Sequence, residues 1–482
     1  HFLGFMSEAQ KIAKNTTILV ISEFISRSLS FILIIILARY LKDIGLGKYS
    51  FIYAFVGIFY IMSDFGLSTL MTRDVAKDKK LTKKYVDNIF GIKVVLCALT
   101  TIIPFIFILF TDKGFDVKLG ILITGIATSF GYLAYPFRNV FVAHERQVYH
   151  AIYSNIERFV AFTLGIAALY MGYGLIGFLI VLAISNFASF LYAYFIVSKK
   201  FVRVGFELDI PFLRKAFRES LPFWFTLIFI TFYFKISTVM LGFMDGFQAT
   251  GWYNAAYKII DASVALPFLV VIVIFPVMSR LHKSQEKILT LLYNKAFYYL
   301  FILGVPLAFG VTMMADRIIL FVYKSSFENS AVALQILIWA AMFIYVNYVM
   351  GFLLNSTGKQ KLFTYSTGIC ALLNIILNFI LIPKYSYIGA SFANVITELV
   401  NFLILIHLTS KAGYKLSLGK LWYRPVLAGI LMAVFLYHLK QLNLFILVPI
   451  AAIFYFSVLF LIKGIGKEEI HLLKLIVQKQ KL

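Results

Sequence analysis

Charged residues inside long apolar segments are the residues of this sequence best placed to do chemistry. Arg27 lies near the middle of the first apolar run, and Lys235 and Lys258 lie within two later runs. An ionisable side chain in hydrocarbon is costly and usually marks a substrate or ion path. Guanidinium and ammonium groups both bind phosphate oxygens, the first as a planar fork and the second as a point charge. The pattern predicts a cationic cavity that binds a phosphate or diphosphate headgroup.

Acidic residues in the same apolar runs could partner those cations or bind a coupling ion. Glu23 precedes Arg27 by one helical turn on the same face, and Asp261 follows Lys258 by three residues, close enough to pair. Such pairs would neutralise the cations and make them structural, so both interpretations stay open. The predicted charge partners or coupling residues, with Na+ or H+ as the coupling cation, are Glu23, Asp261, Asp64 and Glu398. A Phe-Gly pair follows Asp64 and favours a cap or a helix break there.

The elements that must position these residues are membrane-spanning helices. Of the 482 residues, 61% are hydrophobic and only 14% are charged, and the mean hydropathy is +0.89. Runs of about 18 or more apolar residues, each long enough to cross roughly 30 Å of hydrocarbon as a helix, recur along the chain. We therefore expect an all-α polytopic membrane protein with about 14 transmembrane helices. The expected spans are 16–40, 49–70, 87–110, 119–142, 151–171, 174–197, 221–243, 252–279, 290–314, 330–354, 363–382, 388–409, 425–440 and 443–462.

Basic residues predict the orientation of the chain. With an even number of spans both termini share a side, and 30 of the 45 Lys and Arg residues fall in segments on that side, against nine on the other. The positive-inside rule then places both termini in the cytoplasm of a protein in the cell membrane. The formal charge of +23 comes mostly from loops that face anionic headgroups, so we expect no nucleic-acid partner. The first apolar run has full spanning length, and no cleavable signal peptide is expected.

A polar segment at 198–222 separates two very apolar halves and defines the expected domains. These are an N-lobe at 1–197, a cytoplasmic linker at 198–222, a C-lobe at 223–410, two extra spans at 411–465 and an amphipathic tail at 466–482. The halves resemble copies, because Gly47, Tyr49 and Tyr53 recur 204 residues later, starting at Gly251. We expect the linker to lie along the membrane surface as a tether that lets the lobes rock.

Three stretches resemble polysaccharide flippases of the multidrug/oligosaccharidyl-lipid/polysaccharide exporter superfamily. They are 38–77, which begins ARYLKDIGLGKYS, 251–281, which begins GWYNAAYKIID, and 355–402, which begins NSTGKQKLFTYST. The resemblance implies two six-helix lobes in a V-shaped arrangement around a central cavity, plus two C-terminal helices. It also implies that a polyisoprenyl-phosphate- or diphosphate-linked oligosaccharide is moved from the inner to the outer leaflet by alternating access. The implied partners are that lipid-linked oligosaccharide, membrane lipids and glycosyltransferases or a polymerase of the same pathway, with the chain acting as a monomer.

Two other functions remain alternatives at this stage. A cation-coupled multidrug antiporter of the same superfamily would carry cavity carboxylates, whereas most charges in the middle of the spans are positive. A membrane-embedded glycosyltransferase or polymerase would need a large outer loop with paired acids, but the longest expected outer loop, 315–329, holds only Asp316 and Glu328. No phosphate-binding loop of an ATPase is present, so transport would be secondary. Cys97 and Cys370 lie inside apolar runs, and no disulfide, metal site, cofactor or enzymatic activity is predicted.

Overall fold

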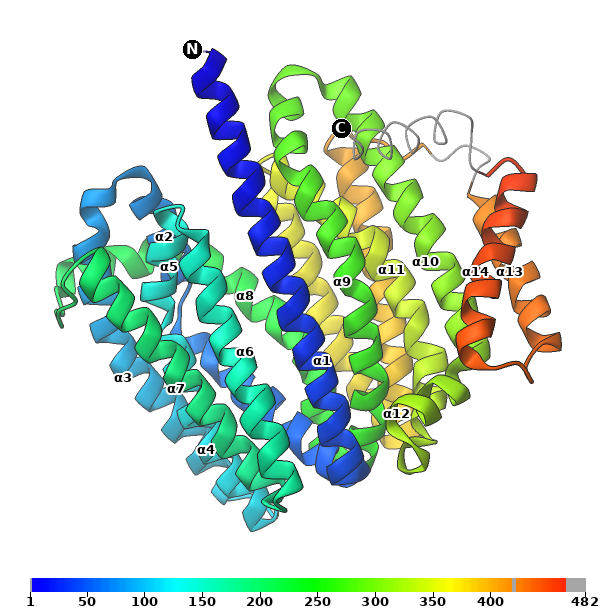
Figure 1. Ribbon diagram of the computed structural model, residues 1–482, viewed down its shortest axis with the longest axis horizontal. Coiled ribbons are helices and arrows are strands. Elements are labelled where there is room, and N and C mark those ends of the chain that lie inside the picture. The colour runs from blue at the N-terminus through cyan, green and yellow to red at the C-terminus, as the bar shows by residue number, and fades with distance from the viewer. Residues whose placement is uncertain (1, 418–421, 465–482) are drawn as a thin grey trace. The chain divides into compact units, whose positions relative to one another are not determined.

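The computed structural model describes residues 2–417 and 422–464, with backbone only for residues 2–24 and Lys283. Throughout these residues the secondary structure is helical, and no strand occurs (Figure 1). The chain forms two compact units, His1–Asn254 and Ala255–Leu482, and each is described by itself. The amphipathic tail predicted at 466–482 lies outside the described residues. The predicted all-α class is confirmed.

In its described residues the first unit contains six long helices, several short ones and the first turns of a seventh long helix. Its elements are α1 (Phe2–Tyr60), η1 (Ile61–Ser63), α2 (Leu67–Lys77), η2 (Lys79–Leu81), α3 (Thr82–Leu109), α4 (Phe115–Leu133), α5 (Tyr135–Ala143), α6 (Gln147–Tyr170), α7 (Gly174–Lys200), α8 (Ile210–Met244) and the first turns of α9 (Phe247–Ser284). Helix α8 therefore belongs to this unit, although the sequence assigns it to the C-lobe.

The second unit holds the rest of α9 and the helices that follow it. These are α10 (Glu286–Tyr323), η3 (Ser325–Phe327), α11 (Ser330–Ser356), α12 (Gln360–Lys411), α13 (Tyr423–His438) and α14 (Leu444–Leu461). Two helices are interrupted by non-glycine residues with positive φ, α1 at Lys42 (φ 57°) and α12 at Ser386 (φ 57°). Both interruptions fall between two predicted spans.

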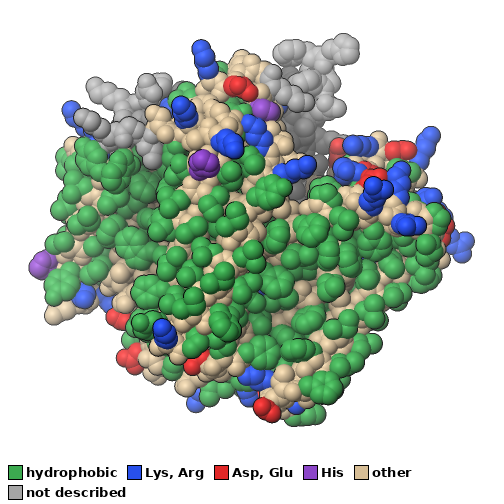
Figure 2. Space-filling model, turned by 180° about the vertical axis from the view of Figure 1, so that it is seen from behind, with side chains coloured by type: hydrophobic (Ala, Val, Ile, Leu, Met, Phe, Trp, Pro, Cys, Tyr) green, Lys and Arg blue, Asp and Glu red, His purple; other side chains and the backbone are tan. Residues whose placement is uncertain are grey.

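Ten helices in the described residues are long and apolar enough to cross a membrane, and α13 is a shorter apolar helix. Figure 2 shows hydrophobic side chains covering most of one face of the molecule, with Lys and Arg gathered at its edges. The chain is therefore a multi-pass membrane protein. Helix α12 has 52 residues, more than one crossing needs, so it contains two of the predicted spans. The total of fourteen spans stays a prediction.

A sharp break follows α1 and brings α8 close. Phe65 (φ 46°) and Gly66 (φ 75°) both adopt left-handed backbone conformations, which glycine tolerates without cost. A Cβ on Gly66 would lie 2.7 Å from the carbonyl oxygen of Ser220 in α8, so glycine also permits the close approach. The indole N–H of Trp224 donates to the carbonyl of Ile61 at 3.3 Å. The break predicted beside Asp64 is thus present, and α8 packs on it.

Helix α1 and the first turns of α9 cross at two glycines that occupy equivalent positions in the predicted repeat. A Cβ on Gly47 would overlap the carbonyl oxygen of Phe247, and a Cβ on Gly251 would overlap the carbonyl oxygen of Asp43. The Asp43 carboxylate also accepts a hydrogen bond from the Gln248 amide at 2.9 Å. Helices in lipid associate through close packing because lipid chains are as apolar as the helices. The two glycines therefore hold this crossing together by backbone contact.

The predicted linker at 198–222 is mostly helical, because α7 extends into it and α8 begins within it. Only residues 201–209 lie outside a helix. The Asp209 carboxylate caps α8 by accepting the backbone N–H of Phe212 at 3.0 Å. Phe201 and Phe212 pack against a core cluster of the first unit, while Phe206 is 61% exposed. The segment therefore lies on the protein and does not hang free.

Polar contacts fasten this segment to the start of α3. The backbone N–H of Gly205 donates to the Asp87 carboxylate at 2.7 Å, and that of Asp209 donates to the Asn88 side-chain oxygen at 2.7 Å. Lys84 forms an ion pair with Asp209 at 3.1 Å. Residues 201–209 are thus a strap bound to the first unit. Whether they let two lobes rock stays a prediction.

Candidate functional site

The predicted cations of the first unit lie on α1 and α8. Arg27 is exposed, and its buried neighbour Ser26 donates a hydrogen bond to the Asn155 side-chain oxygen of α6 at 3.4 Å. Lys235 is half-buried, and its Cε lies 2.9 Å from where a Cβ on Gly57 of α1 would be. A side chain larger than hydrogen at Gly57 would therefore displace the Lys235 ammonium. Glu23 lies on α1, and its side chain is outside the described part.

Lys258, the third predicted cation, belongs to the second unit. Its ammonium forms an ion pair with Asp261 at 3.2 Å, and the two side chains are 35% and 48% exposed. The pairing expected from their three-residue spacing is therefore present. The structure describes Arg27 and Lys235 within one unit and Lys258 within the other, so the three-cation cavity stays a prediction.

Asp64 and Lys93 form a buried ion pair at the break after α1. The Lys93 ammonium lies 2.5 Å from the Asp64 carboxylate, and the side chains are 0% and 6% exposed. The Ser68 hydroxyl donates to the same carboxylate. The ammonium also lies 5.5 Å and 5.2 Å from the ring centroids of Tyr132 and Tyr135. Removing either charge would leave the other buried without a counter-charge, which is costly. The ion pair therefore fixes the helix break against α3.

Sequence reasoning did not join these two residues. They are 29 positions apart, so no helical spacing links them. The usable signal was that two consecutive predicted spans carry Asp64 and Lys93, of opposite charge, near the ends that are predicted to face the cytoplasm. The proposed coupling role of Asp64 stays a prediction, and its partner is now identified as Lys93.

Glu398 is the buried carboxylate of the second unit. It lies on the second part of α12 with an exposed fraction of 2%, and the Asn347 amide of α11 donates to its carboxylate at 2.9 Å. Nearby on α12, the Asn374 amide donates to Thr397 at 3.2 Å. The Asn347–Glu398 hydrogen bond joins α11 to α12, whereas the Asn374–Thr397 bond joins the two parts of α12 on either side of Ser386. A coupling role for Glu398 remains predicted.

Arg138 lies inside the predicted span 119–142 and was not among the predicted site residues. It lies inside α5, which continues the apolar span that starts at Phe115. Its guanidinium carbon is 4.3 Å from the ring centroid of Tyr135, and Tyr135 stacks on Tyr132 at 4.6 Å. The signal in the sequence was the spacing of three between Tyr132, Tyr135 and Arg138, which places them on one helical face.

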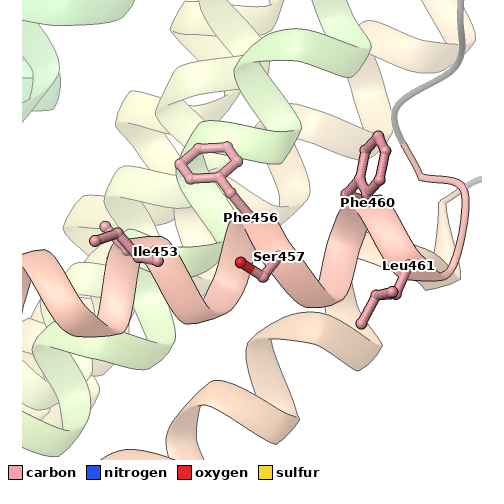
Figure 3. A pocket seen from close by; sticks show the side chains of 6 residues that line it. Ile453, Phe456, Ser457, Phe460 and Leu461 are labelled. Atoms are coloured by element: carbon pink, nitrogen blue, oxygen red, sulfur yellow. The ribbon is translucent and has the colours of Figure 1, made fainter.

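A hollow on α14 carries no charged side chain. Figure 3 shows a shallow hollow on α14 whose labelled side chains are apolar apart from Ser457. Its composition suits contact with lipid chains, and its lining offers no charge to a phosphate. In the described residues no cluster of three or more His, Cys, Asp or Glu could hold a metal ion, and Cys97 and Cys370 are buried free thiols.

The helical fold with ionisable residues inside its spans defines a multi-pass membrane protein of the transporter class. The chain belongs to the family described as polysaccharide biosynthesis protein, whose model matches residues 12–282. The model of the lipid II flippase MurJ family matches residues 251–457. These matches confirm the resemblance found in the sequence, and they agree with the expectation that the chain is not an enzyme.

Relatives among characterised and uncharacterised proteins are similar at low identity. The uncharacterized membrane protein MJ1068 of Methanocaldococcus jannaschii is 24% identical over 514 residues of alignment, covering 98% of this chain and 99% of that protein. The probable low-salt glycan biosynthesis flippase Agl15 of Haloferax volcanii is 25% identical over 213 residues, covering 44% of this chain and 45% of that protein.

Solved structures share the fold. The lipid II flippase MurJ in an inward closed conformation gives a TM-score of 0.77 at 16% identity, covering 91% of this chain and 97% of that one. An inward-facing multidrug resistance MATE family transporter of the MOP superfamily gives 0.62 at 15% identity, covering 80% and 95%. The fold is therefore that of MOP-superfamily transporters, and the higher score is with the flippase.

Proposed function

We propose that this protein flips a polyisoprenyl-phosphate- or diphosphate-linked oligosaccharide from the cytoplasmic to the outer leaflet by alternating access. The observation that carries this proposal is the match of the polysaccharide biosynthesis family over residues 12–282. The lipid II flippase model over 251–457 and the similarity to a glycan biosynthesis flippase add support. A flippase must let a charged, hydrated headgroup cross hydrocarbon, so it needs polar side chains within its spans.

Arg27 and Lys235 are the residues that we assign to the phosphate in this proposal. Arg27 is exposed on α1, and the Lys235 ammonium lies against α1 at Gly57. Lys258 is the third candidate, although Asp261 offsets its charge. The guanidinium of Arg27 offers a planar fork to phosphate oxygens, and the ammonium of Lys235 offers a point charge.

Secondary transport by a chain with cytoplasmic termini in the cell membrane completes the proposal. Na+ or H+ would supply the driving force, and the buried carboxylates Asp64 and Glu398 are the positions at which a cation could act. Glycosyltransferases that build the oligosaccharide on the cytoplasmic face, or a polymerase that extends it outside, would be pathway partners. These assignments follow from the chemistry of the substrate.

The experiment uses proteoliposomes that contain a fluorescent lipid-linked oligosaccharide and measures its movement between leaflets. We expect the double variant Arg27→Ala, Lys235→Ala to flip at least about tenfold more slowly, because it removes two charge-assisted contacts. The matched control is Lys384→Ala, which removes one exposed cation outside the proposed site. If the double variant flips the lipid-linked oligosaccharide as fast as the wild type, Arg27 and Lys235 do not bind its phosphate. Transport of a cationic dye without movement of the lipid-linked oligosaccharide would favour the multidrug antiporter.

A further inference from the structure

We propose that Tyr132, Tyr135 and Arg138 form a loading subsite that binds the phosphate or diphosphate of the lipid-linked substrate before it reaches Arg27 and Lys235. The inference rests on the proposed function for the identity of the substrate. Its chemistry, an anion held by a stacked guanidinium, rests on the geometry of α4 and α5 alone.

A proline builds the local geometry. Pro136 lies at the start of α5 and has no backbone N–H, so α4 ends at Leu133 and α5 starts at Tyr135. The backbone N–H of Arg138 donates to the carbonyl of Ala134 at 2.9 Å, which keeps the helical register across the joint. Tyr135 and Arg138 therefore stay on one face. Helix α5 is held in place by contacts with α2 and α6 (Figure 1).

The guanidinium of Arg138 is fixed in orientation and still has donors to offer. It lies 4.3 Å from the Tyr135 ring centroid, at which distance a cation is attracted to the ring. The Arg138 Nε is buried and has no hydrogen-bond partner among the described residues. A buried donor without an acceptor is costly, so an arriving phosphate oxygen would satisfy it.

The charges around Arg138 leave it without a compensating carboxylate. Asp64 pairs with Lys93 at 2.5 Å, and Glu157 pairs with Arg158 at 3.6 Å. Within the described residues no ion pair joins Arg138 to an acid. The five groups therefore sum to one positive charge, which Arg138 carries. An anion is the ligand that neutralises this cluster.

With the orientation predicted from the basic residues, Arg138 lies near the headgroup level of the inner leaflet. The span runs from Phe115 to Ala143, and Arg138 precedes Ala143, at the predicted cytoplasmic end, by five residues, or about 7 Å along the helix axis. Lys79 in the basic α2–α3 turn donates to the carbonyl of Ala143, which places this helix end beside the cytoplasmic charges. A phosphate on an inner-leaflet lipid lies at the same level, while its polyisoprenyl chain stays in hydrocarbon.

Equilibrium binding to the full chain in detergent micelles tests the subsite without requiring transport. The probes are inorganic diphosphate, a short polyisoprenyl diphosphate, the matching polyisoprenyl alcohol and phosphatidylglycerol. We expect the polyisoprenyl diphosphate to bind most tightly, inorganic diphosphate to bind weakly and to compete with it, and the alcohol and phosphatidylglycerol not to compete. Arg138→Gln should weaken polyisoprenyl diphosphate binding roughly 10- to 100-fold. Arg138→Lys should recover part of this loss, because it keeps the charge and loses the fork.

Two further variants keep the test decisive. Arg146→Gln removes an exposed cation from the neighbouring α5–α6 turn and should leave binding unchanged. If Arg138→Gln does not fold, Tyr135→Leu removes the ring that orients the guanidinium and should also weaken binding. Unchanged binding in the folded Arg138→Gln variant, or equal losses in the Arg146→Gln control, would overturn the subsite. Equal competition by phosphatidylglycerol would reassign the site to bulk lipid headgroups and would overturn it too.

These results separate the subsite from the proposed function. Arg138-dependent binding in a protein that flips no lipid-linked oligosaccharide would keep the anion site and reject the flippase. Normal flipping by a protein whose binding ignores Arg138 would keep the flippase and reject the loading subsite.

Discussion

Breaking the Asp64–Lys93 ion pair should cost more stability than breaking any half-exposed pair of the same charges. The two side chains are 6% and 0% exposed, and the charged atoms are 2.5 Å apart. With an effective dielectric constant of about 20, charges at that separation attract by about 6 to 7 kcal/mol. Burial also removed their hydration, so this attraction is larger than the net contribution of the pair to stability.

Asp64→Asn leaves the Lys93 ammonium buried without its counter-charge. We expect the free energy of unfolding to fall by about 3 to 5 kcal/mol. Lys93→Met should cost a similar amount, because the remaining carboxyl must then stay charged in an apolar site or take up a proton. The double variant contains neither charge of the pair and should recover most of the loss, which gives a large interaction energy in the double-mutant cycle.

Unfolding in mixed dodecyl maltoside and SDS micelles, followed by tryptophan fluorescence, measures these free energies. The matched control is the half-exposed pair in α9, Lys258→Met and Asp261→Asn, for which each loss should be about 1 kcal/mol or less. A loss at Asp64→Asn no larger than in the control would refute the reasoning. Additive losses in the double variant would refute it as well.

Three further predictions follow from backbone contacts and from the strap. Gly47→Ala and Gly251→Ala should each lower the thermal unfolding temperature, because overpacking costs about 1 to 3 kcal/mol. Gly304→Ala should not lower it, because a Cβ at Gly304 meets only ordinary contacts at 3.4 Å and beyond. Equal effects at all three positions would contradict the claim that Gly47 and Gly251 hold α1 and α9 together by backbone contact. Asp87→Ala removes the carboxylate that accepts the Gly205 N–H and should speed hydrogen exchange of the backbone amides across residues 201–209. Unchanged exchange would contradict the claim that Asp87 holds this strap on the first unit. The backbone N–H of Phe212 and the Lys84 ammonium lower the pKa of Asp209. The stabilising contribution of the Asp209 carboxylate is therefore present above about pH 4 and is lost as the pH falls below that value. A carboxyl titration by NMR that gives an ordinary or raised pKa would contradict the claim that Asp209 caps α8.

The fold class was predictable from the sequence because hydrocarbon imposes a simple rule on backbone and composition. Apolar runs of spanning length have to be helices, and breaks expected near residues 42 and 386 occur at Lys42 and Ser386. The segment predicted as a linker at 198–222 is non-helical only over residues 201–209, and it lies within the first unit. Nothing local shows that Gly205 and Asp209 bond to Asp87 and Asn88, because those contacts span more than 115 residues.

The candidate site was predictable only where partners are close in sequence. Lys258 and Asp261 are three residues apart, and the structure pairs them. Asp64 and Lys93 sit on different elements, and only the helix break and the packing of α3 bring them together. Arg138 was not among the predicted site residues, although it lies inside the predicted span 119–142, and the structure places it in α5.

Transbilayer movement of a fluorescent lipid-linked oligosaccharide in proteoliposomes is the measurement on which the proposed flippase activity depends. We expect that the purified chain moves the substrate between leaflets faster than protein-free liposomes do, and that a short polyisoprenyl diphosphate competes. Folded protein that leaves the substrate in its original leaflet, with or without a Na+ or H+ gradient of either direction, would contradict it.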